Sequence, residues 1–540
     1  MKMNHKLFRL VWVFSLSAII IAGCSGNGNG HVKQSGTAAP GNDDKKTATK
    51  RQTFTMSIWD IEKSFQNREN DELLKKVEQD FNITIKPVNV TWSDYNEKFN
   101  LWATSGELPD LFVTDLTLST TYNTWVQQNI IRPLPDDLSP YPNIEKLLKQ
   151  PDLAPLQKDG KFYFVPRQSK LTADDFALER GFIVRKDWME KLGFKTPTTF
   201  EEYKALFKAF AQMDPDGNNK DDTVGLTTNH VPLLQSLFLG SVPELTESYS
   251  WLQEDGKWIP SFVSKNMIDG IVQFRQLYEE GALDKDFAIL KTGDGGDKFA
   301  QGLAGAINMQ MTDAMMKGLK DKWMKYGHEQ EFEDSIILLP IWQHMDGNNY
   351  RNYSASAYSG LFFSSKVDDE KMAAILKLID FAISTPGERL FNYGIEGKDY
   401  TIENDKIVLT REKDSATGTL KPLNQLYPSV DTLSFAFKSF GTVQFPMDIR
   451  IADKGEKLVK MHDEMYDYMI NKFKAPDINW EVLYLSTPAK DKLKNVKYWD
   501  DIVRIVLDNE EPDKLWEQVV KGYEAKGLNQ AITEVNEMKK

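Results

Sequence analysis

The sequence predicts an α/β fold with parallel strands and more than one hydrophobic core. Its 540 residues are 41% hydrophobic and 27% charged, which is ordinary for a folded chain long enough to build two or more cores. Near the start of the folded body, a strand pattern, a helix pattern and a second strand pattern follow one another. This order is typical of a βαβ unit and a parallel sheet.

The first predicted elements lie between residues 53 and 115. Residues 53–59 and 83–90 alternate apolar and polar side chains, as half-buried strands do, and residues 71–81 between them have helical spacing. A third strand is predicted over 109–115, and it ends on Asp115. Because open α/β sheets bind ligands at the carboxyl ends of their strands, we expect a ligand site near Asp115.

A second region begins at about residue 181 and contains a long helix. Thr199 and Glu202 have the spacing of a capping box, which predicts a helix from residue 200 to 213. The aromatic residues of that helix form one stripe, and we interpret them as core packing. Two more helices and three strands are expected further on. The helices are 267–281 and 369–384, and the strands are 302–311, 334–340 and 360–365.

Residues 1–23 have the features of an export signal. A basic start is followed by an apolar run that is short for a membrane span, and small residues stand directly before Cys24. Cys24 is the only cysteine of the chain, so no disulfide can form within it. Its position resembles the lipobox of bacterial lipoproteins; the alternative is an ordinary secretory signal with a chance cysteine. Residues 24–51 then read as a lipidated cysteine and a flexible tether, because large apolar side chains are almost absent.

Neither the charge nor the motifs of the chain favour nucleic-acid binding or catalysis. The formal net charge is −13, whereas a nucleic-acid-binding protein is expected to have a basic face. The sequence contains no HExxH, no GxSxG, no Walker loop and no GxGxxG at a strand-to-helix turn. The Gly-rich stretch 292–297 lacks the lysine of a phosphate loop and is expected to be a flexible surface loop. Paired carboxylates for glycoside chemistry remain open, because a sequence does not reveal their separation.

The stretch from Met213 to Gly225, MDPDGNNKDDTVG, is the sharpest chemical signal. With Asp214 as position 1, Asp216 and Asn218 fall at positions 3 and 5, which is the spacing of a calcium-binding loop. Lys220 would offer its backbone carbonyl at position 7, and Asp222 stands at position 9. Gly225 occupies position 12, where an EF-hand has a bidentate glutamate, so the loop is not an EF-hand. The alternatives are a polar turn and a magnesium site, and magnesium is disfavoured by its strict octahedral geometry.

Aromatic side chains indicate a sugar ligand. Flat rings with a polar tip pack against the C–H faces of sugars, while acids, amides and arginines bind the hydroxyl groups. For each single ring, packing in a core is the alternative. The aromatic residues expected at strand ends or in loops are Trp59, Trp125, Tyr163, Trp251, Trp342, Tyr350, Tyr353 and Tyr358.

Several segments together resemble family 1 extracellular solute-binding lipoproteins, the substrate-binding components of ABC importers. The most specific are IVRKDWMEKLGFKTPTTFEEYKALFKAFAQMDPDGNNKDDTVGL and ERLFNYGIEGKDY, and the similarity runs from about residue 53 to the end. The resemblance implies a two-lobed, periplasmic-binding-protein-like fold whose lobes close on ligand about hinge-crossing strands.

We expect the lobes to be assembled from separate parts of the chain. The N-terminal lobe is expected to comprise 52–170 and 304–355, and the C-terminal lobe 171–303 and 356–540. Crossings between the lobes are expected near 170–183, 300–306 and 351–363.

The resemblance also implies a ligand set, a metal and partners. The ligand is expected to be an oligosaccharide, neutral or acidic, that is handed to ABC permease subunits by a monomer. Acylation of Cys24, with palmitate, would anchor the protein at the extracytoplasmic face of the cell membrane. The expected ligand-binding residues are chosen by their place, because each falls at or near the end of a predicted strand or at a lobe crossing: Trp59, Asp115, Tyr163, Arg167, Asn308, Trp342 and Tyr358.

In the alginate-binding members of this family, a loop like 213–225 holds a structural calcium ion. The ligands implied for this chain are Asp214, Asp216, Asn218, Lys220, Asp222 and Thr223. The family often has glutamate where Thr223 stands, and Asp221 is a possible substitute.

Two other functions remain open at this stage. One is a surface enzyme that degrades polysaccharide, such as a glycosidase or a lyase. The other keeps the fold but binds a peptide, or signals through a receptor instead of a permease.

Overall fold

The computed structural model describes residues 50–115, 120–168, 180–246, 249–353, 355–404, 406–413, 415, 420–437 and 447–539. Residues 50–540 form one compact unit. The predicted signal, Cys24 and the tether up to residue 49 lie outside the described residues. No helix among those described is long and apolar enough to cross a membrane.

The first sheet has the strand order β2-β1-β3-β11-β4. Strand β1 pairs in parallel with β2 and β3, and β11 pairs antiparallel with β3 and β4. The strands are β1 (Gln52–Ser57), β2 (Ile83–Pro87), β3 (Leu111–Thr114), β4 (Phe164–Gln168) and β11 (Ala357–Phe363). Helix α2 (Glu72–Asp80) connects β1 to β2, which confirms the predicted βαβ unit.

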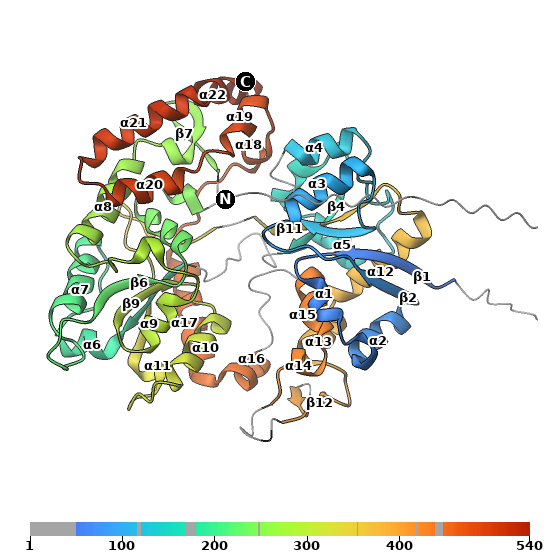
Figure 1. Cartoon of the computed structure of the whole chain (residues 1–540), viewed down its shortest axis with the longest axis horizontal. Coiled ribbons are helices and arrows are strands. Elements are labelled where there is room, and N and C mark those ends of the chain that lie inside the picture. The colour runs from blue at the N-terminus through green and yellow to red at the C-terminus, as the bar shows by residue number, and fades with distance from the viewer. Residues whose placement is uncertain are drawn as a thin grey trace, which may run out of the picture. The chain divides into compact units, whose positions relative to one another are not determined.

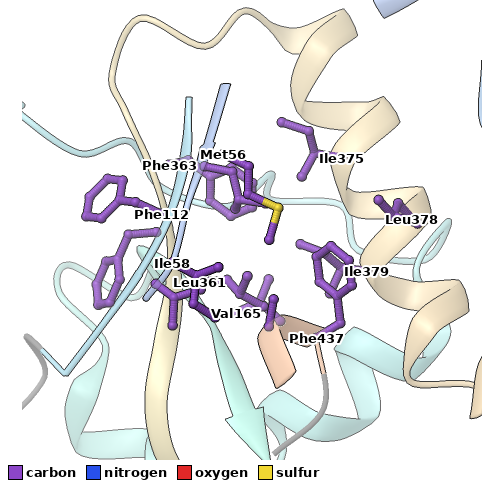
Figure 2. Close-up of a cluster of buried hydrophobic side chains, with 14 of the residues drawn as sticks. Met56, Ile58, Phe112, Val165, Leu361, Phe363, Ile375, Leu378, Ile379 and Phe437 are labelled. Carbon is purple, nitrogen blue, oxygen red and sulfur yellow. The ribbon is translucent and has the colours of Figure 1, made fainter. Parts of the chain in front are cut away.

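A core of buried side chains packs helix α12 (Asp369–Ala382) against this sheet (Figures 1 and 2). Ile375 and Ile379 of α12 lie beside Met56 of β1 and Leu361 of β11 in Figure 2. All four side chains are fully buried. Residues from both halves of the chain therefore build one core, and we call residues 50–168 with 357–437 the first lobe.

Among its described residues, the first lobe contains nine further helices and a hairpin. They are α1 (Ile61–Phe65), α3 (Tyr95–Ser105), α4 (Thr120–Gln127), α5 (Pro142–Leu148), α13 (Thr385–Tyr393), α14 (Leu423–Leu426), α15 (Ser429–Phe437), the 3-10 helices Arg68–Asn70 and Pro151–Leu156, and β12 (Tyr400–Glu403) with β13 (Lys406–Leu409).

The second sheet has the strand order β10-β5-β9-β6. Its strands are β5 (Gly181–Arg185), β6 (Val224–Thr228), β9 (Ala304–Met309) and β10 (Ile336–Leu339). Helix α7 (Phe200–Gln212) packs on this sheet through buried aromatic side chains. The capping box that predicted α7 is present, with Thr199 and Glu202 bonded reciprocally. Hydrogen bonds from the Thr199 and Thr198 backbone lower the pKa of Glu202 to about 2.

The C-terminal helices pack on the second sheet and complete what we call the second lobe, residues 180–353 with 447–539. Its other described elements are α6 (Lys186–Lys191), α8 (Met267–Glu279), α9 (Asp294–Ala300), α10 (Asp313–Met324), α11 (Phe332–Ser335), α16 (Met447–Lys454), α17 (Glu456–Lys472), α18 (Trp480–Tyr484), α19 (Pro488–Leu493), α20 (Tyr498–Leu507), α21 (Pro512–Ala525), α22 (Leu528–Met538), the hairpin β7 (Trp251–Glu254) and β8 (Lys257–Pro260), and the 3-10 helices Val231–Gly240, Pro243–Thr246, Ser261–Val263 and Phe287–Ile289.

The predicted lobe boundaries after residue 303 are wrong. Strand β9 was assigned to the N-terminal lobe, but it pairs with β5 and β6 in the second sheet. Strand β11 and the chain to residue 437 were assigned to the C-terminal lobe, but they complete the first sheet and its core. The chain therefore does not cross at 300–306. It does cross between β10 and β11, as expected, and most of 170–183 lies outside the described residues.

The Gly-rich stretch 292–297 is not a surface loop. Its second half is the first turn of α9, and Gly295 and Gly296 are buried there. A Cβ on Gly295 would lie 2.0 Å from the Thr228 carbonyl oxygen. The glycines let α9 approach β6 closely, so their role is packing.

Candidate functional site

A pocket of about 420 Å³ lies between side chains of the first and second lobes. Its volume is within the range of small-molecule sites. The first lobe contributes Asn96, Phe99, Asn100, Thr114, Asp115, Thr121 and Trp125. The second lobe contributes Tyr249, Trp251, Pro260, Phe262, Leu483, Lys490, Leu493 and Lys494.

Strand β3 places Asp115 on the pocket wall. The strand itself is fully buried, and the chain becomes exposed at Asp115, the residue directly after it. The Asp115 carboxylate accepts a hydrogen bond of 3.2 Å from the Tyr95 hydroxyl of α3. Asp115 is the only acidic residue among the described residues that line the pocket. The pocket lining therefore has one carboxylate that can accept hydrogen bonds from the hydroxyl groups of a ligand.

Next to this wall, Trp59, Trp92 and Tyr95 form what we call the aromatic ledge. The Trp59 and Trp92 rings stack at 4.0 Å between centroids and 3° between planes. Tyr95 meets Trp59 edge-on and bonds to Asp115, so the ledge is joined to the pocket wall. Trp59 is only 6% exposed, whereas Trp92 is 51% exposed. The free face of the ledge is therefore the Trp92 ring.

The second-lobe wall contains three aromatic residues, Tyr249, Trp251 and Phe262, among its eight described lining residues. Trp251 begins β7, and Phe262 follows β8 and stacks on Tyr498 of α20 at 4.9 Å. Burial raises the pKa of the Tyr249 hydroxyl, with a smaller effect of Asp500. The rings of this wall are mostly buried: Trp251 is 2% and Phe262 1% exposed, while Tyr249 is half-buried.

The charged groups of that wall come from α19 and its end. Lys490 donates to the carbonyl oxygens of Leu483 and Leu485, both at 2.7 Å. Lys494 forms an ion pair of 3.1 Å with Asp491. Burial lowers the pKa of both lysines, and that of Lys490 falls to about 7.

Three of the predicted ligand-binding residues have other contacts. Arg167 is fully buried and donates to Phe435, Ala436 and Ser359, which ties α15 to β4 and β11. Asn308 is fully buried and donates to the Gly181 carbonyl and the Ser236 hydroxyl. Trp342 is 2% exposed and donates to Gln273 within the core of the second lobe. None of the three lines the pocket, although the Arg167 guanidinium lies 5.7 Å from the centroid of the Trp59 ring.

Of the four remaining predicted ligand-binding residues, two lie in the ledge or the pocket wall. Trp59 lies in the ledge, and Asp115 lines the pocket. Tyr163 is half-buried and packs on the first-lobe core. Tyr358 belongs to β11, but its side chain lies outside the described residues.

Most other pocket and ledge residues were expected less directly or not at all, and five of them show why. Trp125 and Trp251 were in the wider aromatic set, and both line the pocket. Trp92, Phe262 and Lys490 were missed. Trp92 follows the second predicted strand closely and was within reach of the aromatic argument. Lys490 has no local signal, because only tertiary folding brings α19 opposite β3.

The loop predicted to bind calcium gathers its polar side chains after α7. Asp214 accepts from the backbone N–H groups of Asn218 and Asn219, each at 3.0 Å. The Asn218 amide nitrogen donates to Asp216 at 2.7 Å and to Asp222 at 3.1 Å. Burial raises the pKa of Asp216, and the nearby Asp214 and Asp222 add to the rise. The Lys220 backbone N–H donates to Asn218 at 2.8 Å, so five of the six predicted ligands are in contact.

Asn218 occupies the place between the carboxylates. Among the described residues, no group of three or more His, Cys, Asp or Glu side chains is already arranged to hold a metal ion. The Asn218 Oδ1 atom accepts from the Lys220 backbone N–H at 2.8 Å. A 180° rotation of the amide would give up that bond and would turn the donor between Asp216 and Asp222 into an acceptor. The side chains then offer only oxygen atoms and three negative charges, and this donor set fits calcium.

Thr223 and Gly225 do not join this cluster. The buried Thr223 hydroxyl donates to the Phe210 carbonyl at 2.8 Å, so it faces α7. Gly225 lies in β6, where a Cβ would stand 2.1 Å from the Phe207 carbonyl oxygen and 2.4 Å from that of Ala282. The close approach of α7 to β6 thus excludes the glutamate that an EF-hand has at this position.

Comparison with known proteins identifies the family. A model of bacterial extracellular solute-binding proteins matches residues 72–389. The lipoprotein LipO of Bacillus subtilis is 27% identical over 461 residues, which cover 82% of this chain and 84% of LipO. The polygalacturonan/rhamnogalacturonan-binding protein YtcQ of Bacillus subtilis is 26% identical, over 78% of this chain and 79% of YtcQ.

Solved structures have the same fold. The alginate-binding protein AlgQ2, crystallised without calcium ion, aligns with a TM-score of 0.66 at 20% identity, over 91% of this chain and 98% of AlgQ2. The Streptococcus pneumoniae ABC-transporter substrate-binding protein FusA, in complex with kestose, aligns with a TM-score of 0.63 at 19% identity, over 91% of this chain and 98% of FusA. With two α/β lobes and a pocket lined from both, the chain belongs to the bacterial extracellular solute-binding protein family.

Proposed function

We propose that this protein is the substrate-binding lipoprotein of an ABC importer and that its pocket captures an oligosaccharide. The observation that carries the proposal is the aromatic pocket with its few polar groups, which lies beside the aromatic ledge. Stacked rings cover the apolar faces of sugar units, and Asp115 accepts hydrogen bonds from their hydroxyl groups. A ligand held by side chains from both lobes favours the closed arrangement, because it contacts both lobes only when they are together.

The names of related proteins support a sugar ligand. YtcQ is named for binding polygalacturonan and rhamnogalacturonan, and FusA for fructooligosaccharide transport. FusA was solved with kestose. These ligands include both acidic and neutral sugars, so the class of oligosaccharide has to be argued from the residues of this chain.

Binding without catalysis is part of the proposal. Glycoside hydrolysis uses a pair of carboxyl groups on either side of the scissile bond. Asp115 is the only acid among the described residues that line the pocket, and one carboxyl group does not make the pair that this chemistry uses. A peptide ligand has no specific support, whereas the stacked indoles match the flat faces of sugars.

The anchor and the metal are further parts of the proposal. The basic, apolar and small-residue pattern before Cys24 supports lipid attachment, which would hold the protein at the outer face of the cell membrane. The convergence of Asp214, Asp216, Asn218 and Asp222 supports a structural calcium ion. That ion would neutralise the charge of the loop and hold it in one conformation.

The experiment is a thermal-shift screen of the purified protein against neutral and acidic oligosaccharides. A ligand that binds only the folded protein raises the melting temperature by mass action, about 2.7 kcal/mol of stabilisation at a hundred times its dissociation constant. We expect at least one oligosaccharide to raise it, and no member of a matched set of peptides. A shift with peptides alone would overturn the proposal.

A further inference from the structure

Lys490 is a buried cation on the wall of the pocket. It is 3% exposed, and its ammonium group donates to the carbonyl oxygens of Leu483 and Leu485 near the end of α18. The Trp251 ring lies 5.9 Å from the ammonium nitrogen. An ammonium group has three N–H donors, so two carbonyl oxygens leave one donor for a further acceptor.

No carboxylate of the described residues forms an ion pair with Lys490. Asp491, the next residue, pairs with Lys494 and accepts a hydrogen bond of 2.6 Å from the Ser486 hydroxyl. Asp115, the acid of the opposite wall, accepts from Tyr95. A buried charge is costly unless it is paired, and a charge on a pocket wall can be paired by a ligand.

We propose that the pocket selects an oligosaccharide that carries a carboxylate, and that the Lys490 ammonium is the group that pairs with it. This proposal rests on the proposed function and names the class of sugar. The neighbouring Lys494 adds positive charge but is already neutralised by Asp491, so the specific contact belongs to Lys490. The aromatic rings of the same wall then cover the apolar faces of the sugar units.

The charge state of Lys490 supports this assignment. Burial, with a smaller effect of Lys494, lowers its pKa to about 7, so the amine is only partly protonated near neutral pH. A carboxylate beside it favours the ammonium form, so an acidic ligand should bind together with a proton. The other ionisable groups around it are Lys494 and Asp491 of α19, Asp115 beyond β3, Tyr249, and Glu534 of α22, which accepts from the Ala489 N–H.

The test measures the affinity of the purified protein for short oligouronides of several sugars, each compared with its methyl ester. The ester keeps the size and the hydroxyl groups of the sugar and removes the charge. We expect one acid to bind about thirty-fold or more tightly than its ester, as for a buried charge pair. If acid and ester bind equally, or if only neutral oligosaccharides bind, the inference is wrong and the proposed function stands. If no oligosaccharide binds, both are wrong.

Two variants separate Lys490 from its neighbour. In Lys490→Met the preference for the acid over the ester should fall to about one, because the apolar side chain keeps the volume and loses the charge. Lys494→Met is the matched control and should keep most of the preference. The same loss in both variants would contradict a specific role for Lys490.

Proton uptake tests the inference in the unaltered protein, whether or not Lys490→Met folds. Calorimetric titrations in two buffers of different ionisation enthalpy give the number of protons taken up. Near neutral pH we expect uptake with the acid and none with its ester. The uptake should persist in Asp115→Asn, which excludes that carboxylate as its source. Acid binding without uptake would overturn the assignment to Lys490.

Discussion

The buried amine of Lys490 affects ligand binding, and it also affects the stability of the protein without ligand. Its pKa is about 7 in the folded protein against an ordinary value of 10.5. As the pH falls from 10.5 towards 7, the unfolded chain binds a proton that the folded protein does not, so stability is lost across that window. Below the pKa of Lys490 in the folded protein, both the folded and the unfolded chain bind the proton, and stability falls no further.

We therefore predict that Lys490→Met raises the free energy of unfolding near neutral pH, and that its advantage shrinks as the pH rises. The slope is at most about 1.4 kcal/mol per pH unit. Urea unfolding of both proteins at a series of pH values measures it. An advantage that is independent of pH would show that Lys490 is not the group that titrates.

Trp92 is the exposed ring of the aromatic ledge, and we expect its loss to affect sugar binding more than folding. Its ring is half exposed, so Trp92→Ala should leave the melting temperature nearly unchanged. The sugar should bind about tenfold more weakly, because a stacked ring contributes on the order of 1 kcal/mol beyond its buried area. Tyr326→Ala, at an exposed ring outside the ledge and pocket, is the control. Equal affinities in both variants would remove the ledge from the site.

For single residues, the sequence indicated which types of side chain bind the ligand better than it indicated where those side chains lie in the fold. Asp115 could be found because its place after a buried strand puts it at a sheet edge. Trp342 was expected in the ligand site and is buried against Phe182, Phe200 and Tyr203. An aromatic ring suits a core and a sugar site equally, and only its neighbours decide which it joins.

The loop after α7 should bind calcium and stabilise the protein through it. We predict that adding a chelator to protein saturated with calcium lowers the free energy of unfolding by about 2–3 kcal/mol at a hundredfold excess over the dissociation constant. In Asp216→Asn this effect should be lost. The control Asp255→Asn, at an exposed carboxylate in the turn between β7 and β8, should retain it. A melting temperature that does not respond to chelator would rule out a structural metal in this loop.

The close contact between α7 and β6 should make Gly225 intolerant of a side chain, and Gly318 of α10 serves as the control. Gly225→Ala should lower the free energy of unfolding by about 3 kcal/mol, because its Cβ would meet two backbone carbonyl oxygens. Gly318→Ala, in α10 with nothing within 4 Å of the new methyl group, should raise it by about 0.5–1 kcal/mol. Chemical unfolding of the two variants compares them. A stable Gly225→Ala variant would contradict the close packing of α7 on β6.

At the scale of elements, local patterns were sufficient where they repeat over several turns or strands. The capping box fixed the start of α7, and period-2 alternation found β1 and β2. The prediction of a surface loop at residues 292–297 was wrong because it treated glycines as a sign of flexibility. Here Gly295 and Gly296 begin a helix that packs against the end of β6, and a contact between distant segments has no local signal.

For the whole molecule, the order of elements predicted the α/β class but not the path of the chain. Strand β11 returns to the first sheet after the chain has built the second, and it pairs with β3 and β4. Its apolar residues would fit either sheet equally well. The lobe boundaries therefore depended on pairing partners that are far apart in sequence, and the same is true of Lys490 and Asp115 in the pocket.

The central claim is that both lobes together bind an oligosaccharide without cleaving it. The most direct test is a calorimetric titration of the purified protein with the oligosaccharide that most raises its melting temperature, followed by analysis of the sugar after long incubation. We predict saturable binding of about one sugar per protein and full recovery of the intact sugar. No saturable heat, or new reducing ends or unsaturated uronates in the recovered sugar, would contradict the claim.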